Sequence, residues 1–284
     1  MIPAAFEYHR PADISAALAV LQEHGDEARV LAGGHSLIPM MKLRMADIEH
    51  LVDLQDIGEL KGITVEGRDV RIGAMTTQHE LITSADIARV APILHEAALQ
   101  IADPQVRYMG TVGGNIANGD PGNDMPGLMQ CLDATFHLIG PGGARTARAR
   151  EYYEGAYMTD REEDEILSAI TFVAPDGGYA YEKQKRKIGD YATAACAAIV
   201  KMEGGVCSGA AIAMTNLSDT PIFSDEAGAA LVGTPCDAAT IDAAVAAAKA
   251  AIDPAEDNRG PVEFKMHVAG TIIRRAIERA IGRA

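Results

Sequence analysis

The sequence predicts an α+β protein with two domains, and three observations support this. The chain has 284 residues, which exceeds one minimal domain. Apolar residues make up 48% and charged residues 23%, which is typical of a globular core and not of disorder. In the last part of the chain, strand-like segments come before a group of helix-like segments. That order favours α+β over a doubly wound sheet.

The N-terminal region is predicted to be a small α/β unit. Asp13 suits the N-cap of a helix over about residues 14–23, because its side chain can accept a hydrogen bond from the first turn. Gly25 marks the end of that helix. The pattern then predicts a strand at 29–32, an apolar segment at 37–43 and a strand at 50–53.

The middle region combines strands, helices and one glycine-rich segment. Residues 69–75 alternate with a period of two, which indicates a strand. Residues 110–126 are rich in Gly, Pro, Asn and Asp, so we expect a long, tightly turned functional loop there and no regular element. The other predicted elements are helices at 77–83, 92–101 and 124–132 and strands at 135–139 and 166–173.

Asp176 and the two glycines after it form the best candidate for a domain boundary. It divides the chain into residues 1–176, with subdomains at about 1–56 and 57–176, and residues 177–284. In the second domain, Glu203-Gly204-Gly205 joins two strand-like runs and predicts a hairpin. The predicted elements there are strands at 194–202 and 206–216 and helices at 224–232, 238–251 and 263–281.

The formal charge of −15 disfavours a nucleic-acid partner, since a field of that sign repels phosphate backbones. A phosphate-bearing ligand would need local backbone N–H groups to hold it. The sequence shows no apolar run long enough to span a membrane and no secretory signal, so we expect a cytoplasmic protein.

Close cysteine pairs are typical of zinc and iron–sulfur sites, and this sequence has none. It therefore predicts no metal site on this chain. Four cysteines are expected to be free thiols: Cys131, Cys196, Cys207 and Cys236. Several histidines show no ligand spacing and are expected at the surface or in the core: His9, His79, His95 and His267.

Two short glycine-containing turns carry most of the chemistry, at residues 32–36 (Ala-Gly-Gly-His-Ser) and 111–115 (Thr-Val-Gly-Gly-Asn). Glycine lets the backbone approach a ligand closely, and successive N–H groups can form a concave anion site. Two such turns could hold the two ends of one pyrophosphate. Neither matches the GxGxxG or GxxxxGK[ST] pattern. On spacing alone, ordinary turns are an equally good interpretation.

At these turns the sequence resembles the FAD-binding medium subunits of the molybdenum hydroxylases, the xanthine dehydrogenase family. The family motifs AGGxS and T(I/V)GGN match residues 32–36 and 111–115, and the resemblance covers the whole chain. It is closest to the aerobic carbon monoxide dehydrogenase branch. The supporting stretches are residues 32–39, 101–110, 118–124 and 187–193.

The resemblance implies an FAD-binding domain of two α/β subdomains, similar to vanillyl-alcohol oxidases (PCMH-type), followed by a C-terminal α+β domain. It implies FAD as the cofactor of this chain. Molybdenum cofactor would lie on a large partner subunit and iron–sulfur clusters on a small one, in a dimer of heterotrimers. The complex could associate with the inner face of the membrane. Electrons would pass from the clusters through FAD to an external acceptor, so no catalytic residue is expected here.

The resemblance also implies roles for individual residues. Backbone N–H groups of the first turn would bind the pyrophosphate, and the second turn would approach it from the other side. Asp124 would accept hydrogen bonds from the adenosine portion, and Lys183 would lie near the flavin. Tyr191 would lie beside the isoalloxazine ring. The implied cofactor-binding residues are Ala32, Gly33, Gly34, His35, Ser36, Ile101, Thr111, Gly113, Gly114, Asn115, Asp124, Leu167, Lys183 and Tyr191.

Several of these residues have structural alternatives. Asp124 suits a helix N-cap, and Lys183 suits a solvated charge in the run 183–187. Tyr191 suits a half-buried sheet tyrosine. Ile101 and Leu167 could be plain core. His35 could donate to phosphate but is not expected to act as a base.

Gly34→Val is expected to place Cβ in the phosphate space and to lose flavin with little unfolding. Two other functions stay open. One is the FAD subunit of a related hydroxylase acting on a purine or another heteroaromatic, because substrate choice lies on the large subunit. The other is a nucleotide-binding scaffold without redox turnover, which would be colourless where a flavoprotein is yellow.

Overall fold

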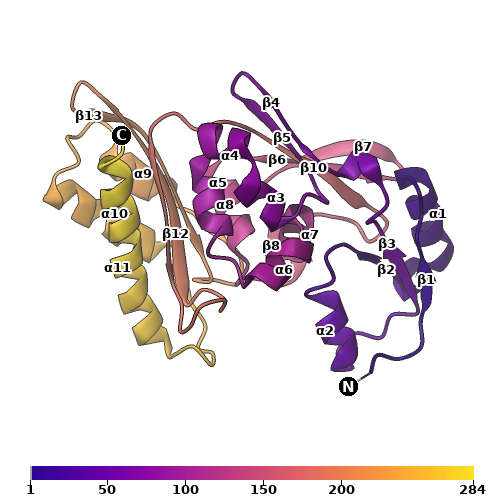
Figure 1. The fold of residues 1–284 in the computed structure, drawn as a ribbon. Helices are drawn as coiled ribbons and strands as arrows, with labels where there is room; N and C mark the ends of the chain where they lie inside the picture. Colours follow the sequence, from indigo (N-terminus) through magenta and orange to yellow (C-terminus); the bar gives the residue numbers. More distant parts are fainter. Residues whose placement is uncertain (1) are drawn as a thin grey trace.

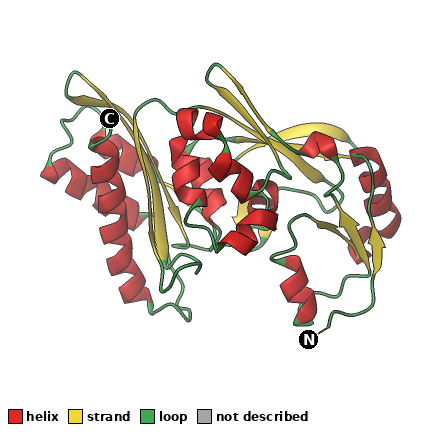
Figure 2. Cartoon of the chain, in the orientation of Figure 1, coloured by secondary structure: helices red, strands yellow, loops and turns green. Residues whose placement is uncertain are grey.

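Three main sheets, one parallel and two antiparallel, organise the molecule along its length (Figure 1, Figure 2). We describe residues 2–284 in a computed structural model. Helices lie between and beside the sheets. The predicted mixture of helices and sheets is confirmed. Among the described residues, no helix combines the length and the apolar character needed to cross a membrane.

The N-terminal unit is a parallel sheet with the strand order β1-β3-β2. Helix α1 packs through Ile14, Ala17 and Leu21 in the same apolar cluster as Val52, and α2 packs through Met41 with Leu51. Neighbouring strand residues point to opposite faces, so the two helices cover opposite faces of the sheet. Its elements are β1 (Glu7–His9), α1 (Ile14–His24), β2 (Ala28–Leu31), α2 (Leu37–Lys42) and β3 (His50–Asp53).

The ends of α1 follow from the sequence. The Asp13 side chain accepts a hydrogen bond from the N–H of Ala16 at 2.8 Å, which caps the first turn. Gly25 has a φ of +49°, a conformation that glycine adopts without strain. The predicted helix over 14–23 is therefore confirmed, with one extra residue. Short 3₁₀ helices occur at Gly25–Glu27 and Gly58–Leu60.

The middle unit is a five-stranded antiparallel sheet with helices on one face, where Phe136, Leu138 and Ile170 join helix residues in the largest core. Its strands, in sheet order, are β4 (Ile63–Glu66), β5 (Asp69–Gly73), β10 (Ile166–Val173), β6 (Thr135–Gly140) and β7 (Gly143–Arg148), and a ribbon joins β8 (Tyr153–Gly155) to β9 (Met158–Thr159). Its helices are α3 (Gln78–Thr83), α4 (Ala85–Val90), α5 (Pro92–Ala98), α6 (Pro104–Met109), α7 (Val112–Ala117) and α8 (Asp124–Cys131).

The expectation of an irregular loop over 110–126 is wrong. Residues Val112–Ala117 form helix α7, and Asp124 is already the first residue of α8. Two glycines in one turn lower helix propensity, so composition pointed away from a helix. The Thr111 side chain accepts a hydrogen bond from the N–H of Gly114 and caps α7, which helps this short helix to form.

The C-terminal unit is an antiparallel sheet between two apolar layers. Along β12, Ala195, Ala197 and Ile199 face the middle core, whereas Cys196 and Ala198 face the C-terminal helices. Burial on both sides explains a continuous apolar strand. Figure 1 shows α10 and α11 on the outer side of β12. The elements are β11 (Gly178–Gln184), β12 (Ala194–Glu203), β13 (Val206–Thr215), β14 (Ile222–Phe223), α9 (Asp225–Leu231), α10 (Ala238–Ala250) and α11 (Val262–Ile281).

The predicted hairpin at 203–205 is confirmed, because β12 pairs with β13 and both Gly204 and Gly205 have positive φ. The chain passes from the middle sheet to the C-terminal sheet between Val173, where β10 ends, and Gly178, where β11 begins. The domain division at residue 176 stays a prediction.

Candidate functional site

One cavity of about 640 Å³ brings together segments from all three units. That volume is within the usual range of ligand pockets. All fourteen residues that the resemblance implies for the cofactor lie in its wall. The structure thus brings these residues together, while their contacts with a ligand stay predictions.

The first turn, residues 32–36, connects β2 to α2 and lies in the cavity wall. Within the described residues, none of the N–H groups of 33–36 donates a hydrogen bond. Gly34 has a φ of +74°, so the chain bends there in a conformation that favours glycine. The turn therefore offers consecutive unpaired backbone donors, which is what an anion site needs.

The second turn, residues 111–115, differs because the N–H groups of 112–115 already have acceptors inside the protein. Two of them reach carbonyls of the segment before α3, and two reach Thr111 itself. The bonds are Val112 N to Thr76 O at 2.8 Å, Gly113 N to Ala74 O at 2.8 Å, Gly114 N to Thr111 Oγ1 at 3.0 Å and Asn115 N to Thr111 O at 3.1 Å. The N–H groups of 112–115 are therefore less available to a ligand than those of 33–36, and contact of both turns with one pyrophosphate stays a prediction.

Close packing against another segment of the chain explains two of the four glycines in these turns. A Cβ on Gly33 would lie 2.3 Å from the carbonyl oxygen of Met109, and one on Gly113 would lie 2.4 Å from the Cβ of Ala74. The first turn thus abuts the segment that leads into the second. A Cβ on Gly34 would face Ile38 and Leu31. These two side chains and the backbone strain at a φ of +74° are thus reasons for glycine there, while an approach of Cβ to phosphate stays a prediction.

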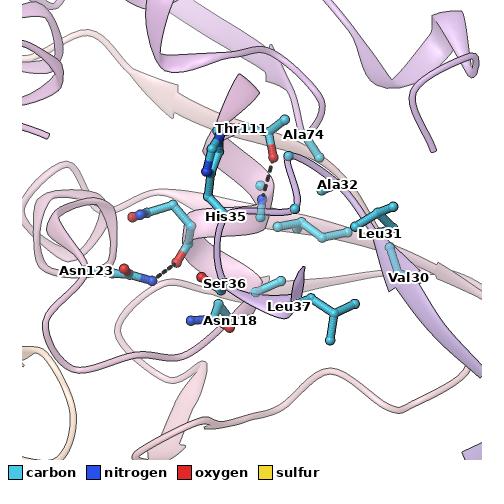
Figure 3. A pocket seen from close by; sticks show the side chains of 18 of the residues that line it. Val30, Leu31, Ala32, His35, Ser36, Leu37, Ala74, Thr111, Asn118 and Asn123 are labelled. Atoms are coloured by element: carbon cyan, nitrogen blue, oxygen red, sulfur yellow. Dashed lines mark hydrogen bonds between the residues drawn. The ribbon is translucent and has the colours of Figure 1, made fainter. Parts of the chain in front are cut away.

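Asn115 extends the second turn toward α8 through its side chain and carbonyl. Its Oδ1 accepts from the N–H of Met125 at 3.1 Å, and its carbonyl accepts from the Asn123 side chain at 2.8 Å. The Nδ2 group makes no hydrogen bond within the described residues. Figure 3 shows His35 and Ser36 of the first turn and Thr111 of the second around the same pocket. The second turn can thus offer a side-chain amide donor to a ligand.

A buried ion pair lies in the cavity wall where α8 meets β11. Lys183 Nζ donates to Asp124 Oδ2 at 2.8 Å, and the Tyr181 hydroxyl donates to Asp124 Oδ1 at 2.5 Å. The Lys183 side chain is only 1% exposed. Burial, and then the neighbouring Asp124 carboxylate, raises the pKa of Tyr181 well above its usual value, so Tyr181 stays a neutral donor.

This geometry removes two of the structural alternatives. Lys183 is not a solvated charge, because it is buried and paired with Asp124. Asp124 is not an N-cap, because Asn123 holds that position and Asp124 is the first helical residue. Each Asp124 oxygen already accepts one hydrogen bond and keeps a lone pair that can accept another.

Ile101, Leu167 and Tyr191 are the other residues that the resemblance implies outside the two turns, and all three line the cavity. Ile101 and Leu167 are buried in the main core and also line the cavity, so both interpretations hold together. Tyr191 lies in the loop after β11, so the alternative that it is a half-buried sheet tyrosine is wrong. The Arg259 guanidinium lies 5.5 Å from its ring centre. Burial raises the pKa of the Tyr191 hydroxyl.

Sequence reasoning missed Gln78, the first residue of α3. Its side chain is buried, it lines the cavity, and neither polar atom of its amide has a partner among the described residues. A buried amide without partners is costly, so it points to a polar ligand group. No local pattern singles out Gln78. Further lining residues that were not predicted are Asn118, Asn123, Tyr157, Arg161, Glu165 and Asp190.

Two protein-family models together cover most of the chain. Residues 4–173 match the family described as FAD binding domain in molybdopterin dehydrogenase, and residues 179–280 match the CO dehydrogenase flavoprotein C-terminal domain. The chain is 59% identical to a carbon monoxide dehydrogenase medium chain of Afipia carboxidovorans, over 100% of this chain and 99% of that one. It is 46% identical to the corresponding chain of Hydrogenophaga pseudoflava, with the same coverage.

A solved structure gives the same result in three dimensions. The chain is similar to one in reconstituted CO dehydrogenase from Oligotropha carboxidovorans, with a TM-score of 0.98 and 59% identity over 100% of both chains.

Proposed function

The chain belongs to the family of FAD-binding domains in molybdopterin dehydrogenases, and from this premise we propose that it relays electrons through FAD within a carbon monoxide dehydrogenase complex. The family supports FAD as its cofactor and places it among the flavoprotein components of oxidoreductases. The observation that carries the site assignment is the set of unpaired N–H groups at residues 33–36 in the cavity wall.

The residues present fit an FAD molecule. Uncharged backbone donors of the first turn would hold the diphosphate, which suits an anionic ligand on a chain of net charge −15. Asn115 would add a side-chain donor from the second turn. The Asp124 carboxylate would accept from the adenosine portion, and the unpartnered Gln78 amide would pair with polar groups of the cofactor.

Bound FAD would supply the electron-accepting and electron-donating chemistry, while the protein binds and orients it. Ile101 and Leu167 would exclude water from one side, because both are buried apolar walls of the cavity. Lys183 would lie near the flavin as part of a neutral pair with Asp124, so its charge is already compensated. Tyr191 would shield the ring from solvent.

We infer further that the chain assembles with a large molybdenum-cofactor subunit and a small iron–sulfur subunit, as a dimer of heterotrimers. The relatives at 59% and 46% identity are medium chains of carbon monoxide dehydrogenases, which supports carbon monoxide as the substrate of the complex. An external acceptor would take the electrons from this chain.

The site is tested by FAD binding to the purified chain and to a Gly34→Ala variant. The chain should be yellow, and its colour should bleach with a reductant. Alanine at a φ of +74° costs about 1–2 kcal/mol and distorts the turn, so FAD should bind at least tenfold more weakly in a fluorescence titration. A colourless chain after reconstitution with FAD would support the scaffold function.

The matched control is Gly25→Ala, which has a φ of +49° at the end of α1 with no neighbour within 4 Å. It should lose a similar stability and keep its FAD affinity. Equal FAD affinity in Gly34→Ala and Gly25→Ala would contradict the assignment of the first turn. For the native complex, metal analysis and a carbon monoxide oxidation assay test the substrate, and activity on a heteroaromatic alone would favour the related hydroxylase.

A further inference from the structure

Three histidines meet in the N-terminal unit outside the cavity. His9 ends β1, His24 ends α1 and His50 begins β3. One ring nitrogen of each lies within 4.8 Å of the other two. The sequence gives no hint of this cluster, because the three residues belong to different elements and meet only when the parallel sheet forms.

The cluster has the donor set of a transition-metal site. His9 Nε2 lies 3.0 Å from His50 Nδ1, close to the ~3.3 Å that separates two ligands of a tetrahedral zinc ion with bonds of about 2.0–2.1 Å. Glu7 Oε2 lies 3.8 Å from the same His50 nitrogen, and its side chain is mostly exposed and free to turn. Two imidazoles and a carboxylate therefore surround one point.

His24 supplies a third imidazole after one rotation. Its ring stacks on that of His50, with centres 3.6 Å apart and an angle of 10° between the planes. Lone pairs lie in the ring planes, so two parallel rings cannot direct them at one ion. Metal binding thus requires the His24 ring to turn about its side-chain bonds, and the partly exposed position of His24 leaves room for this.

The electrostatics of the place favour a cation. His24 is the last residue of α1, and the carboxyl end of a helix carries a partial negative charge. The chain as a whole is also strongly acidic. Three nitrogen donors with one carboxylate are typical of zinc and related first-row ions, and unlike the all-oxygen sets of calcium or magnesium.

We propose that His9, His24 and His50, together with Glu7, bind one divalent transition-metal ion of the zinc class. The ion connects β1, α1 and β3 and stabilises the N-terminal unit. His50 pairs with Ala28 at the start of β2, whereas the first turn follows Leu31 at its end. The cluster is thus about 10 Å from the first turn along the strands, and the ion stabilises structure without taking part in electron transfer.

The test titrates Zn²⁺ alone into the chelator-treated, FAD-loaded full chain by calorimetry. One equivalent should bind, and its affinity should fall at least tenfold in His9→Gln and in His50→Gln. His267→Gln, an exposed histidine on α11, is the matched control and should bind Zn²⁺ as the unaltered chain does. Zinc should raise the melting temperature of the unaltered chain and of His267→Gln by more than that of His9→Gln or His50→Gln.

The His24→Gln variant tests whether His24 binds the metal ion or only stacks on His50. A smaller but measurable loss of Zn²⁺ affinity is expected, because His24 must turn away from His50 before it can bind and so contributes less than His9 or His50. Retained FAD shows that each variant is folded. Absence of a stoichiometric Zn²⁺ site, or equal Zn²⁺ affinity in folded His50→Gln and His267→Gln, would overturn the proposal and leave a hydrogen-bonded histidine cluster only.

Discussion

The two glycine turns look alike in sequence and work differently in the structure. In the first turn, the N–H groups of 33–36 border the cavity and have no acceptor in the part of the chain that the structure describes. In the second turn, the N–H groups of 112–115 are bonded to Thr76, Ala74 and Thr111. The first turn therefore has free backbone donors that suit an anion, whereas the second is the packed start of a helix and borders the cavity with its side chains.

The difference teaches that a Gly-Gly pair does not by itself indicate ligand contact. Gly113 lets α7 approach Ala74, and Gly33 lets the first turn approach Met109. These are contacts of backbone with backbone. Of the four glycines in the two turns, only Gly34 has a positive φ. It lets the chain bend sharply, as is typical of a phosphate-binding turn.

The largest expected effect concerns the buried ion pair that lies next to the second turn. Asn115 connects this turn to α8, whose Asp124 is paired with Lys183. Lys183→Met would leave a buried carboxylate without its counter-ion, so the free energy of unfolding should fall by about 3–5 kcal/mol in urea denaturation. Lys201→Met, which removes exposed ion pairs, should change it by less than about 1 kcal/mol. Similar losses in both variants would contradict the anchoring role of the buried pair.

The next prediction compares a glycine that packs closely against its neighbours with a glycine that has open space around it. Gly113→Ala would place Cβ 2.4 Å from the Cβ of Ala74, so we expect a loss of about 3 kcal/mol in unfolding free energy. Gly209→Ala, with no neighbour within 4 Å, should be nearly neutral. If Gly113→Ala keeps full stability and loses only FAD, the second turn binds the cofactor by close backbone approach after all.

Removing FAD should affect the two turns unequally. Amide hydrogen exchange at 33–36 should be fast in the FAD-free chain and should slow about 100-fold at an FAD concentration of 100 Kd, or about 2.7 kcal/mol. Amides of 112–115 should be protected in both states, because their acceptors belong to the protein. Equal protection changes in both turns would remove the distinction between them.

The smallest effect tests the side-chain contribution of the second turn. Asn115→Asp keeps the acceptor for Met125 and replaces the free amide donor by a negative charge. Repulsion of the diphosphate should weaken FAD binding about tenfold, or ~1.4 kcal/mol, with little change in the unfolding transition. Gln22→Glu on the exposed side of α1 adds the same charge and should leave FAD affinity unaltered. An unchanged affinity in Asn115→Asp would place Asn115 outside the ligand contacts.

The sequence by itself determined several local elements and indicated which segments line the cavity. Asp13 caps its helix, Gly204 and Gly205 form the predicted hairpin, and the motifs at 32–36 and 111–115 both line one cavity. These features depend on neighbours along the chain, so residue type and spacing contain them.

Only the tertiary structure decided which amides are free, which charges are paired and which histidines meet. The N–H groups of Val112 and Gly113 donate to carbonyls of the segment before α3. Lys183 of the C-terminal unit pairs with Asp124 of the middle unit. Gln78 is left without partners, and His9 meets His24 and His50. The physical reason is that hydrogen bonds, ion pairs and close backbone contacts depend on distances between remote segments, and those distances are fixed only by packing.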